Sequence, residues 1–513
     1  MAGSSLTPPG QRQRVIWLRW LVPVGILAVA SGLGALGWLG WSYLTIPLDT
    51  RGEVSFDREL RIPPIAPSTI EEGVKVFELE MSPGETDFGQ ANSTPTWGIN
   101  GSYLGPTIRA SRGETVRIDV TNELNEPTSL HWHGMHLPAK MDGGPHQMIA
   151  PGDTWVPEWE IDQPAATLWY HPHPHGRTGM HVYRGLAGMF IVDDEEAHGL
   201  PDTYGVDDVP LIVQDRKFHD DGRLDFSHYS FQSAGVTGDT ILVNGVPGAY
   251  FDVTRQFTRL RVLNASNTRP YNFHFEDYRD FAVVGSDGGL LPASVGTSNL
   301  QLSPGERAEI VVRFNPGETV RLQSQHSDSA DRIAGGRDRL DIMEFRAGPT
   351  LVSGEAPPDE LASMPQPDQV PTSRERSFNL SGFSINGRSM DMTRVDLVAT
   401  AGDSEVWAVT NVDGQTHNFH IHDVQFRIID INGEAPPAVL AGRKDTVWIP
   451  PETTIRLLVT FSDYTSTEFP YMYHCHILRH EDMGMMGQFL VVEPGQSTRP
   501  EDYQLSTHNH NMP

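Results

Sequence analysis

Alternation of apolar and polar residues is the dominant pattern along the chain, and it predicts β-strands. Residues 115–122 read TVRIDVTN, residues 258–264 read TRLRVLN and residues 405–411 read EVWAVTN. Successive side chains of a strand point to opposite faces, so each segment would bury one face. A proline-containing turn and a further strand follow each segment. The threefold repetition predicts three copies of one β-sandwich.

The predicted domain boundaries follow this repeat. The three all-β sandwiches occupy residues 76–197, 205–349 and 376–495. A linker rich in Pro, Glu, Ser and Asp spans 350–375, residues 45–75 form a spacer, and 496–513 form a disordered tail. The chain contains 49 glycines and 39 prolines, which suits a β-rich protein with many turns.

The N-terminus departs from the strand pattern. Residues 1–19 contain several arginines and precede an uncharged stretch, 20–44. A helix over that stretch would be about 37 Å long, enough to cross a ~30 Å hydrocarbon core. The arginines would stay cytoplasmic, so we predict a single-pass cell-membrane anchor with the sandwiches on the extracytoplasmic side. The alternative is a cleaved signal peptide and a secreted or periplasmic protein.

The net charge narrows the range of partners. A formal charge of −28 argues against a nucleic-acid partner, which would require a basic surface. It suits an exported protein and could concentrate cations near the surface. A length of 513 residues fits three domains of roughly 150 residues each.

The single cysteine lies in an unusual setting. Cys475 sits in the sequence His-Cys-His, and His480 and Met485 follow it. One thiolate, imidazoles and a weak axial thioether form the ligand set of a mononuclear blue-copper site. A structural zinc site would use several thiolates, and one cysteine cannot form a disulfide within the chain. The remaining alternative is a buried cysteine that acts as a small apolar residue.

Four His-x-His pairs supply eight further imidazoles. Residues i and i+2 of a strand face the same way, so each pair can present both rings to one cavity. Two pairs belong to the first sandwich and two to the third, which predicts a multinuclear metal cluster between them. Imidazoles alone suit copper, iron or zinc. The pairs are His131/His133, His171/His173, His420/His422 and His474/His476.

The same alternation separates the cysteine from this cluster. Cys475 lies between two cluster histidines, so its sulfur points to the opposite face. His417 is an odd number of residues from His420 and can also face away. With His480 and Met485 they would form a second site, joined to the cluster by a covalent path through the backbone.

The middle sandwich carries a degenerate version of the third. Residues 272–276 read NFHFE where residues 418–422 read NFHIH. Tyr271 stands in the place of His417, and the middle sandwich has no cysteine. We predict that it binds no copper and that His274 is an ordinary packed histidine.

The motifs together resemble those of the multicopper oxidases, most of all the bacterial laccase and cuprous oxidase branch. The similarity runs from about residue 76 to 495 and rests on HWHG (131–134), WYHPHPHG (169–176), HNFHIH (417–422) and HCHILRHEDMGMM (474–486). It implies three tandem cupredoxin-like Greek-key domains and four copper ions. His131 and His420 would bind type 2 copper. His417, Cys475 and His480 would bind type 1 copper with Met485 axial. The type 3 pair would be bound by His133, His171, His173, His422, His474 and His476.

The resemblance also implies a reaction. Phenolic substrates, Cu(I) or both would lose single electrons at type 1 copper, and dioxygen would be reduced to water at the cluster. Asp142 and Glu481 match carboxylates that handle protons there, or they simply orient ligands by hydrogen bonding. Asp413 matches a carboxylate near the type 1 histidine where reductants dock, or it is an ordinary turn aspartate.

One departure from the family concerns methionine. Cuprous oxidases of this branch often carry a methionine-rich insertion over the type 1 site. Residues 350–400 hold only Met364, Met390 and Met392, which weakens a dedicated Cu(I) oxidase and implies a site open to phenols. Two alternatives remain: a copper-sequestering envelope protein without turnover, and a structural envelope protein that reuses the fold. The complete ligand set disfavours both.

Overall fold

The computed structural model describes residues 47–194, 199–227, 234–327, 329–330 and 334–505. The predicted membrane helix at 20–44 lies outside these residues. Across the described ranges, the helices are too short or too polar to cross a bilayer. The described residues contain two short α-helices, α2 (Thr178–Arg184) and α3 (Leu478–Asp482), with 3-10 turns η1 (Ala139–Met141), η2 (Pro367–Gln369), η3 (Ala438–Leu440) and η4 (Pro500–Asp502).

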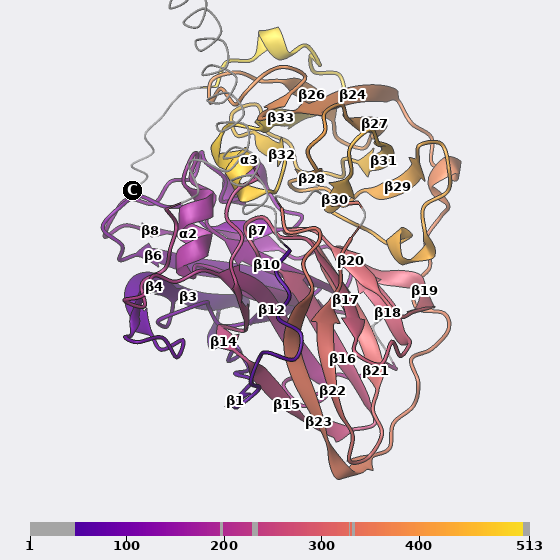
Figure 1. Cartoon of the computed structure of the whole chain (residues 1–513). Helices are drawn as coiled ribbons and strands as arrows, with labels where there is room; N and C mark the ends of the chain where they lie inside the picture. The colour runs from indigo at the N-terminus through magenta and orange to yellow at the C-terminus, as the bar shows by residue number, and fades with distance from the viewer. Residues whose placement is uncertain (1–46, 195–198, 228–233, 328, 331–333, 506–513) are drawn as a thin grey trace, which may run out of the picture. The chain divides into compact units, whose positions relative to one another are not determined.

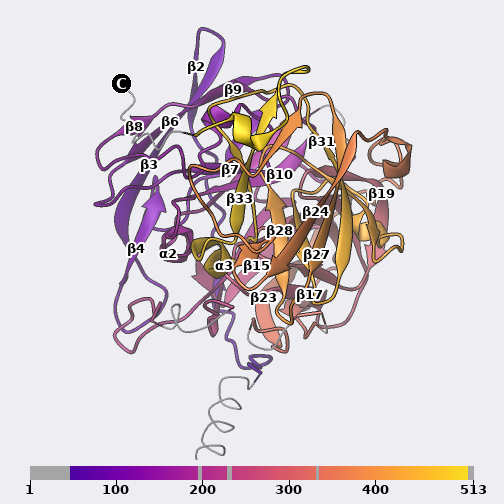
Figure 2. The ribbon, with the colours of Figure 1, turned by 90° about the horizontal axis from the view of Figure 1, so that it is seen from above.

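The strands form three pairs of sheets that follow the order of the chain (Figures 1 and 2). The first pair contains a sheet in the order β2 (Ser68–Glu71), β3 (Val74–Thr86), β6 (Thr115–Asn122) and β8 (Thr154–Trp155). Strand β4 (Thr94–Ile99) joins β3, and β9 (Glu158–Glu160) joins β6. The other sheet has the order β5 (Ile108–Ser111), β11 (Gly188–Asp193), β10 (Ala166–His171) and β7 (His131–His133).

The middle pair is the largest. One sheet has the order β14 (Val246–Pro247), β13 (Thr240–Val243), β12 (Asp208–Arg216), β16 (Phe257–Asn264), β21 (Arg307–Arg313), β18 (Phe281–Ser286) and β19 (Gly289–Thr297). The other has the order β1 (Arg58–Glu59), β15 (Ala249–Arg255), β23 (Leu340–Val352), β22 (Thr319–Ser324), β17 (Tyr271–Phe275) and β20 (Leu300–Leu302).

The third pair carries the C-terminal motifs. One sheet has the order β25 (Ser384–Ile385), β24 (Arg374–Ser381), β27 (Ser404–Asn411), β31 (Thr454–Thr460) and β29 (Arg427–Ile431). The other has the order β26 (Leu397–Thr400), β33 (Met486–Val492), β32 (Tyr471–His474), β28 (His417–Ile421) and β30 (Thr446–Ile449).

The three repeated segments play the same part in each pair. They form β6, β16 and β27, and each pairs in parallel with an earlier strand of its own sheet: β3, β12 or β24. In β6 the alternation is realised directly, because Val116, Ile118 and Val120 are fully buried and the residues between them are not. The mostly β architecture predicted from the sequence is therefore confirmed.

The asparagine that ends each repeat has one structural role. Its side-chain amide donates two hydrogen bonds to carbonyls of the following loop and strand. Asn122 binds the carbonyls of Glu126 and Ile149 at 3.0 and 2.9 Å, and Asn264 and Asn411 make equivalent pairs. A buried amide satisfied in this way holds the turn that precedes the histidine-bearing strands of the first and third pairs.

The segments predicted as spacer and tail include packed residues. Strand β1 pairs in parallel with β15, and Phe56 and Leu60 are buried. At the other end, Leu505 is buried against Val398 and Leu490. Residues 353–373 connect β23 with β24, within the predicted linker.

Candidate metal centre

The eight paired histidines come together in one buried site between the first and third sheet pairs. None is more than 1% exposed. The ring of His131 stacks on that of His422 with centroids 3.8 Å apart, and His133 stacks on His420 at 3.7 Å. Their nitrogen atoms form three groups with all ligand atoms within 4.8 Å: His131/His420/His422, His133/His171/His476 and His173/His422/His474.

The register between paired strands places these rings beside one another in the site. In the first pair, His171 of β10 lies opposite His131 of β7, and in the third, His474 of β32 lies opposite His420 of β28. Only the pair in β7 lies wholly within a strand. The other three strands end between the two histidines, so His173, His422 and His476 are presented just beyond strand ends.

Burial keeps most of the cluster histidines neutral. Desolvation holds the pKa of His133, His171, His173, His420, His422 and His476 well below the usual value, and neighbouring imidazoles lower it further. Burial also lowers the pKa of His474 to about 3. A metal ligand must offer a lone pair, so neutral imidazoles are ready to bind.

Two of these rings, those of His131 and His420, have a buried Nε2 atom without a hydrogen-bond partner among the described residues. His131 and His420 each use Nδ1 to bond a backbone carbonyl, that of Asp142 at 2.9 Å and Asp445 at 2.8 Å. That bond leaves the lone pair on Nε2, which lacks any hydrogen-bond partner within the described part of the chain. Buried polar atoms are rarely left unpaired, so the arrangement fits a metal at Nε2 of both residues.

The two carboxylates predicted to serve the cluster contact its ligands. Asp142 Oδ2 accepts a hydrogen bond from His422 Nδ1 at 2.8 Å. Glu481 lies between His173 and His474, with carboxylate oxygens 3.5 and 3.3 Å from their Nδ1 atoms. Burial raises the pKa of Glu481 well above its usual value, which favours the protonated form of its carboxyl group.

The second predicted site lies on the other side of Cys475. The thiol Sγ is 3.8 Å from His417 Nδ1 and 3.5 Å from His480 Nδ1. All three residues are buried. Met485 is also fully buried, and its carbonyl accepts a hydrogen bond from the Cys475 amide at 3.1 Å. The structure thus brings His417, Cys475 and His480 together, as predicted, and places Met485 in the same buried core as Cys475.

The charges of this second site differ from those of the cluster. Burial raises the pKa of the Cys475 thiol, but His480 and His417 lower it to about 6 overall. Burial lowers the pKa of His417, while Asp413 and the thiol raise it to about 9. Asp413 lies 3.3 Å from His417 Nε2, and its side chain is 21% exposed. Asp413 is therefore a partly solvated carboxylate at the rim of the site.

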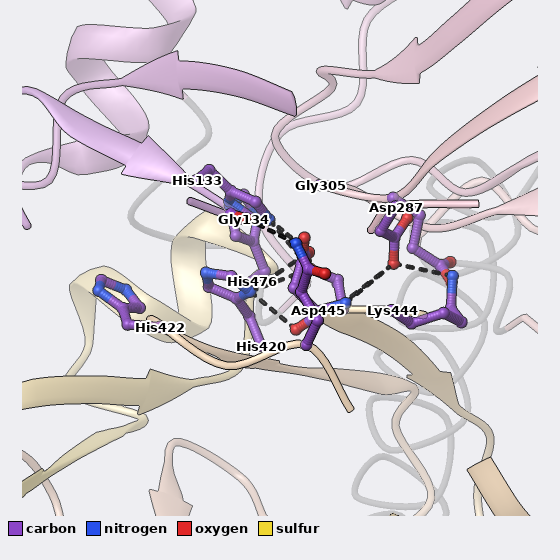
Figure 3. Close-up of polar contacts among 12 residues, drawn as sticks. His133, Gly134, Asp287, Gly305, His420, His422, Lys444, Asp445 and His476 are labelled. Atoms are coloured by element: carbon purple, nitrogen blue, oxygen red, sulfur yellow. Dashed lines mark hydrogen bonds and ion pairs between the residues drawn. The ribbon is translucent and has the colours of Figure 1, made fainter. Parts of the chain in front are cut away.

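Sequence reasoning missed two residues that contact ligands. Asn418 Oδ1 accepts hydrogen bonds from the Cys475 thiol at 3.4 Å and from the His476 amide at 2.6 Å, so it links the two sites. Asp445 Oδ1 is 2.9 Å from His133 Nε2 (Figure 3). The available signal was a run of charges, Arg-Lys-Asp at 443–445, placed directly before the buried strand β30.

The donor chemistry matches copper. Imidazoles with one thiolate and a nearby thioether are soft and borderline donors that suit copper, and the cluster offers imidazoles only. His274, the corresponding histidine of the middle sheets, instead bonds the Phe275 carbonyl at 2.8 Å and stacks on Tyr278.

Comparisons with known proteins agree with this geometry. Family models described as multicopper oxidase match residues 80–197 and 360–495. The chain is 35% identical over 441 residues to the multicopper oxidase mco of Staphylococcus haemolyticus, covering 85% of this chain and 92% of that protein. It is also 36% identical over 460 residues to the cell division protein FtsP of Xenorhabdus nematophila, covering 88% and 95%.

A solved structure of a laccase is also similar to this chain. The crystal structure of a laccase from Pediococcus acidilactici aligns with a TM-score of 0.78 and 36% identity, covering 85% of this chain and 93% of that one. The chain therefore belongs to the multicopper oxidase family, oxidoreductases that use dioxygen.

Proposed function

We propose that the chain holds four copper ions and oxidises phenolic compounds, Cu(I) or both, with dioxygen as the electron acceptor. The observation that carries this proposal is the complete set of buried ligands on the two sides of Cys475. Copper bound there would supply the one-electron redox chemistry and the reduction of dioxygen to water. The proposed architecture is three tandem cupredoxin-like Greek-key domains with the boundaries predicted from the sequence.

The proposed ligand assignment is the one that the resemblance to multicopper oxidases implies. His131 and His420, with their unpaired Nε2 atoms, would hold the type 2 ion. His417, Cys475 and His480 would hold the type 1 ion, with Met485 axial. The type 3 pair would be held by His133, His171, His173, His422, His474 and His476.

The chain itself provides the connection between the two sites. Cys475 is bonded through the backbone to His474 and His476, whose rings lie in the cluster. Asn418 adds a second link, because its Oδ1 accepts from both the Cys475 thiol and the His476 amide. This arrangement supports electron transfer from the thiol side to the cluster over a few bonds.

Protons would come from a buried acid. Burial raises the pKa of the Glu481 carboxyl group well above its usual value, and the group lies within 3.5 Å of two cluster imidazoles. A carboxyl group in that position can donate a proton to reduced oxygen and be reprotonated afterwards. Asp142, bonded to His422 Nδ1, would orient that ligand and hold a second proton-accepting oxygen near the cluster.

The surroundings of the type 1 ligands support an aromatic reductant. The half-buried ring of Phe383 lies 5.4 Å from that of His480. The amide of its neighbour Gly382 donates to Asp413 Oδ2, so this turn and the rim carboxylate are joined. A phenol could stack on Phe383 and donate its hydroxyl proton to Asp413.

The proposed location of the protein is the cell membrane. The uncharged stretch 20–44 after an arginine-containing N-terminus supports a single-pass anchor of the cell membrane, with the sheets on the extracytoplasmic side. Cleavage of the segment as a signal peptide would give a secreted or periplasmic protein instead.

Oxygen consumption by the copper-loaded full-length chain tests the proposal. Cu(I) and a simple methoxyphenol would be compared side by side with free copper removed. We expect uptake with the phenol, and uptake with Cu(I) alone would indicate a copper-detoxifying oxidase. Stoichiometric copper binding without oxygen uptake from either reductant would contradict the proposal and favour a sequestration protein.

A further inference from the structure

His133 differs from the other first-pair histidines in the nitrogen it turns to the cluster. Its Nδ1 lies 3.4 Å from His171 Nε2, on the cluster side. Its Nε2 lies 2.9 Å from Asp445 Oδ1 and 3.1 Å from Thr446 Oγ1. His131 has the opposite arrangement, with Nδ1 bonded to a carbonyl and Nε2 facing inward. His133 can act as a ligand through Nδ1 only if its proton stays on Nε2.

Asp445 is placed to hold that proton and contacts ligands from two sheet pairs. It precedes β30 of the third pair and is fully buried. Its carboxylate faces His133 of the first pair, and its backbone carbonyl accepts from Nδ1 of His420 at 2.8 Å. One residue therefore sets the ring nitrogen that each of these two histidines presents to the cluster.

Arg307 of the middle sheets holds Asp445, which is labelled in Figure 3 together with Asp287 and Lys444. Its Nη1 and Nη2 donate to Asp445 Oδ1 and Oδ2 at 2.7 and 2.6 Å, and both side chains are fully buried. Its Nε donates to the carbonyl of Thr167 in β10 at 2.9 Å. Arg307 opens β21, so this guanidinium connects a strand of the middle pair with β10 of the first pair and with the residue directly before β30 of the third.

Neighbouring charges balance the buried pair. Lys444 Nζ lies 2.9 Å from Asp287 Oδ2 and 3.1 Å from Glu306 Oε1. Asp287 in turn accepts the Arg307 amide at 2.8 Å. Buried charges require partners of this kind, and a bidentate arginine fixes the plane of the carboxylate it binds.

Two glycines show how closely the backbone packs on this network. A Cβ on Gly134 would lie 2.4 Å from Asp445 Oδ2 and 2.7 Å from Arg307 Nη2. A Cβ on Gly305 would lie 3.0 Å from the ring of His476. Both have a positive φ, +87° and +88°. At Gly134 and Gly305 the backbone therefore packs so closely on this network and on His476 that a side chain would not fit without a shift of its neighbours.

We propose that Arg307 and Asp445 are positioning residues of the copper cluster, through which the middle sheets fix the orientation and tautomer of His133. This inference rests on the proposed function, because His133 must be a ligand. The middle sheets supply none of the predicted ligands, yet they would control the cluster through one guanidinium. Their role is then more than that of a spacer between two metal-bearing units.

The test uses Asp445→Asn and Arg307→Lys in the full-length chain. An asparagine has one acceptor oxygen for two donors, and a lysine cannot form the bidentate fork. We expect both variants to lose cluster copper, with affinity about 10- to 100-fold lower, while the blue type 1 band remains. Copper per chain and the absorption and EPR spectra would report the loss, independently of turnover.

Nitrogen NMR of labelled histidines in the copper-free protein provides a second readout. We expect the wild-type His133 ring to carry its proton on Nε2 and to lose this preference in Asp445→Asn. This measurement is informative even if the loaded protein shows no oxidase activity, so failure of the proposed function is distinguishable from failure of this inference.

The matched control is Asp215→Asn. Asp215 is buried in the middle sheets and accepts from Arg269 Nε at 3.0 Å and from the Gly238 amide at 2.6 Å. We expect this variant to lower the melting temperature while its copper content and His133 tautomer stay unchanged. Equal copper loss in the control, or wild-type copper content and tautomer in the Asp445 and Arg307 variants, would overturn the proposal.

Discussion

The two ligand sets lie on opposite sides of one short segment, yet their environments differ in charge. On the type 1 side, His417 has a pKa raised to about 9 and Cys475 has a pKa lowered to about 6, which favours an imidazolium–thiolate pair. On the cluster side, burial lowers the pKa of nearly every histidine, so the rings are neutral. Access to solvent differs as well: Asp413 is 21% exposed, whereas Glu481 is 1% exposed.

This difference shows how one short segment can contribute to two sites, one that a reductant can approach and one that is closed to solvent. The type 1 set keeps a solvated carboxylate at its edge, where a reductant can approach. The cluster keeps its acid buried, and burial raises the pKa of this carboxyl group, Glu481. Because side chains alternate, the type 1 ligand Cys475 and the cluster ligands His474 and His476 are adjacent in sequence. The carboxylates around each ligand set then give the two sites different charges.

Replacing Cys475 with Ser should have the largest effect. A serine hydroxyl cannot replace the thiolate as a copper ligand, so the blue band and turnover should fall to background. The cluster lies on the other face, so it should retain its copper and its EPR signal. Copper content and visible absorption would be measured together, and loss of all copper would contradict the independence of the two sites.

Glu481→Gln should be next in size and act on the cluster side alone. Glutamine keeps the shape of the side chain but cannot supply a proton, so kcat should fall about 10²- to 10⁴-fold. The KM for the reductant and the blue band should remain unchanged. Asp482→Asn is the matched control, since Asp482 accepts the Gly179 amide at 3.1 Å, and we expect a much smaller loss.

Asp413→Asn should have a smaller effect, confined to the type 1 side. The variant weakens the contact with His417 Nε2 and removes the acceptor for a phenolic proton. We expect kcat/KM for a methoxyphenol to fall about tenfold, with cluster spectra unchanged. Steady-state kinetics at several phenol concentrations would measure the change, and an altered EPR signal of type 2 copper would argue against separate environments.

His136→Gln should have the smallest effect on turnover and should change stability instead. His136 bridges Asp423 Oδ1 at 2.7 Å and Asp463 Oδ1 at 3.0 Å, close to the cluster. Burial lowers the pKa of His136, but the two carboxylates raise it to about 9. We expect the variant to lose about 1–3 kcal/mol of unfolding free energy.

The pH dependence of that loss follows from the sign of the shift. A folded-state pKa above the unfolded value of about 6.5 means that protonation stabilises the folded protein. The contribution is fully present below about pH 6.5 and disappears as the pH rises through about 9. Urea unfolding of copper-free wild type and variant across this range would measure it, and a difference that grows with pH would contradict the assignment.

Much of the site could be predicted from the sequence because most of the predicted ligands lie in short motifs of a few residues. The separation of Cys475 from its flanking histidines follows from alternation alone. The structure shows that this alternation persists one or two residues past the strand ends, since His173, His422 and His476 lie outside the strands. The residues just past these strand ends therefore keep the alternating side-chain directions that were assumed for strands.

The remaining contacts could not be predicted because they join distant segments. Arg307 meets Asp445 across 138 residues, and neither residue lies in a recognisable motif. Asn418 sits inside the motif HNFHIH, but its neighbours gave no sign that its amide would reach both Cys475 and His476. Such pairings depend on how the three sheet pairs dock, which no local pattern encodes.

The N-terminal edge of the middle sheets bears on how the protein could be processed. From Leu48, whose amide donates to Asp338 Oδ1 at 2.8 Å, the chain is bound to the folded body, and β1 adds a parallel strand to β15. A protease that cut just after β1 would detach an edge strand from one of the two middle sheets. A cut before residue 48 would leave every described strand in place. A form of the protein that begins near Leu48 would therefore keep every described strand, including those that carry the predicted copper ligands.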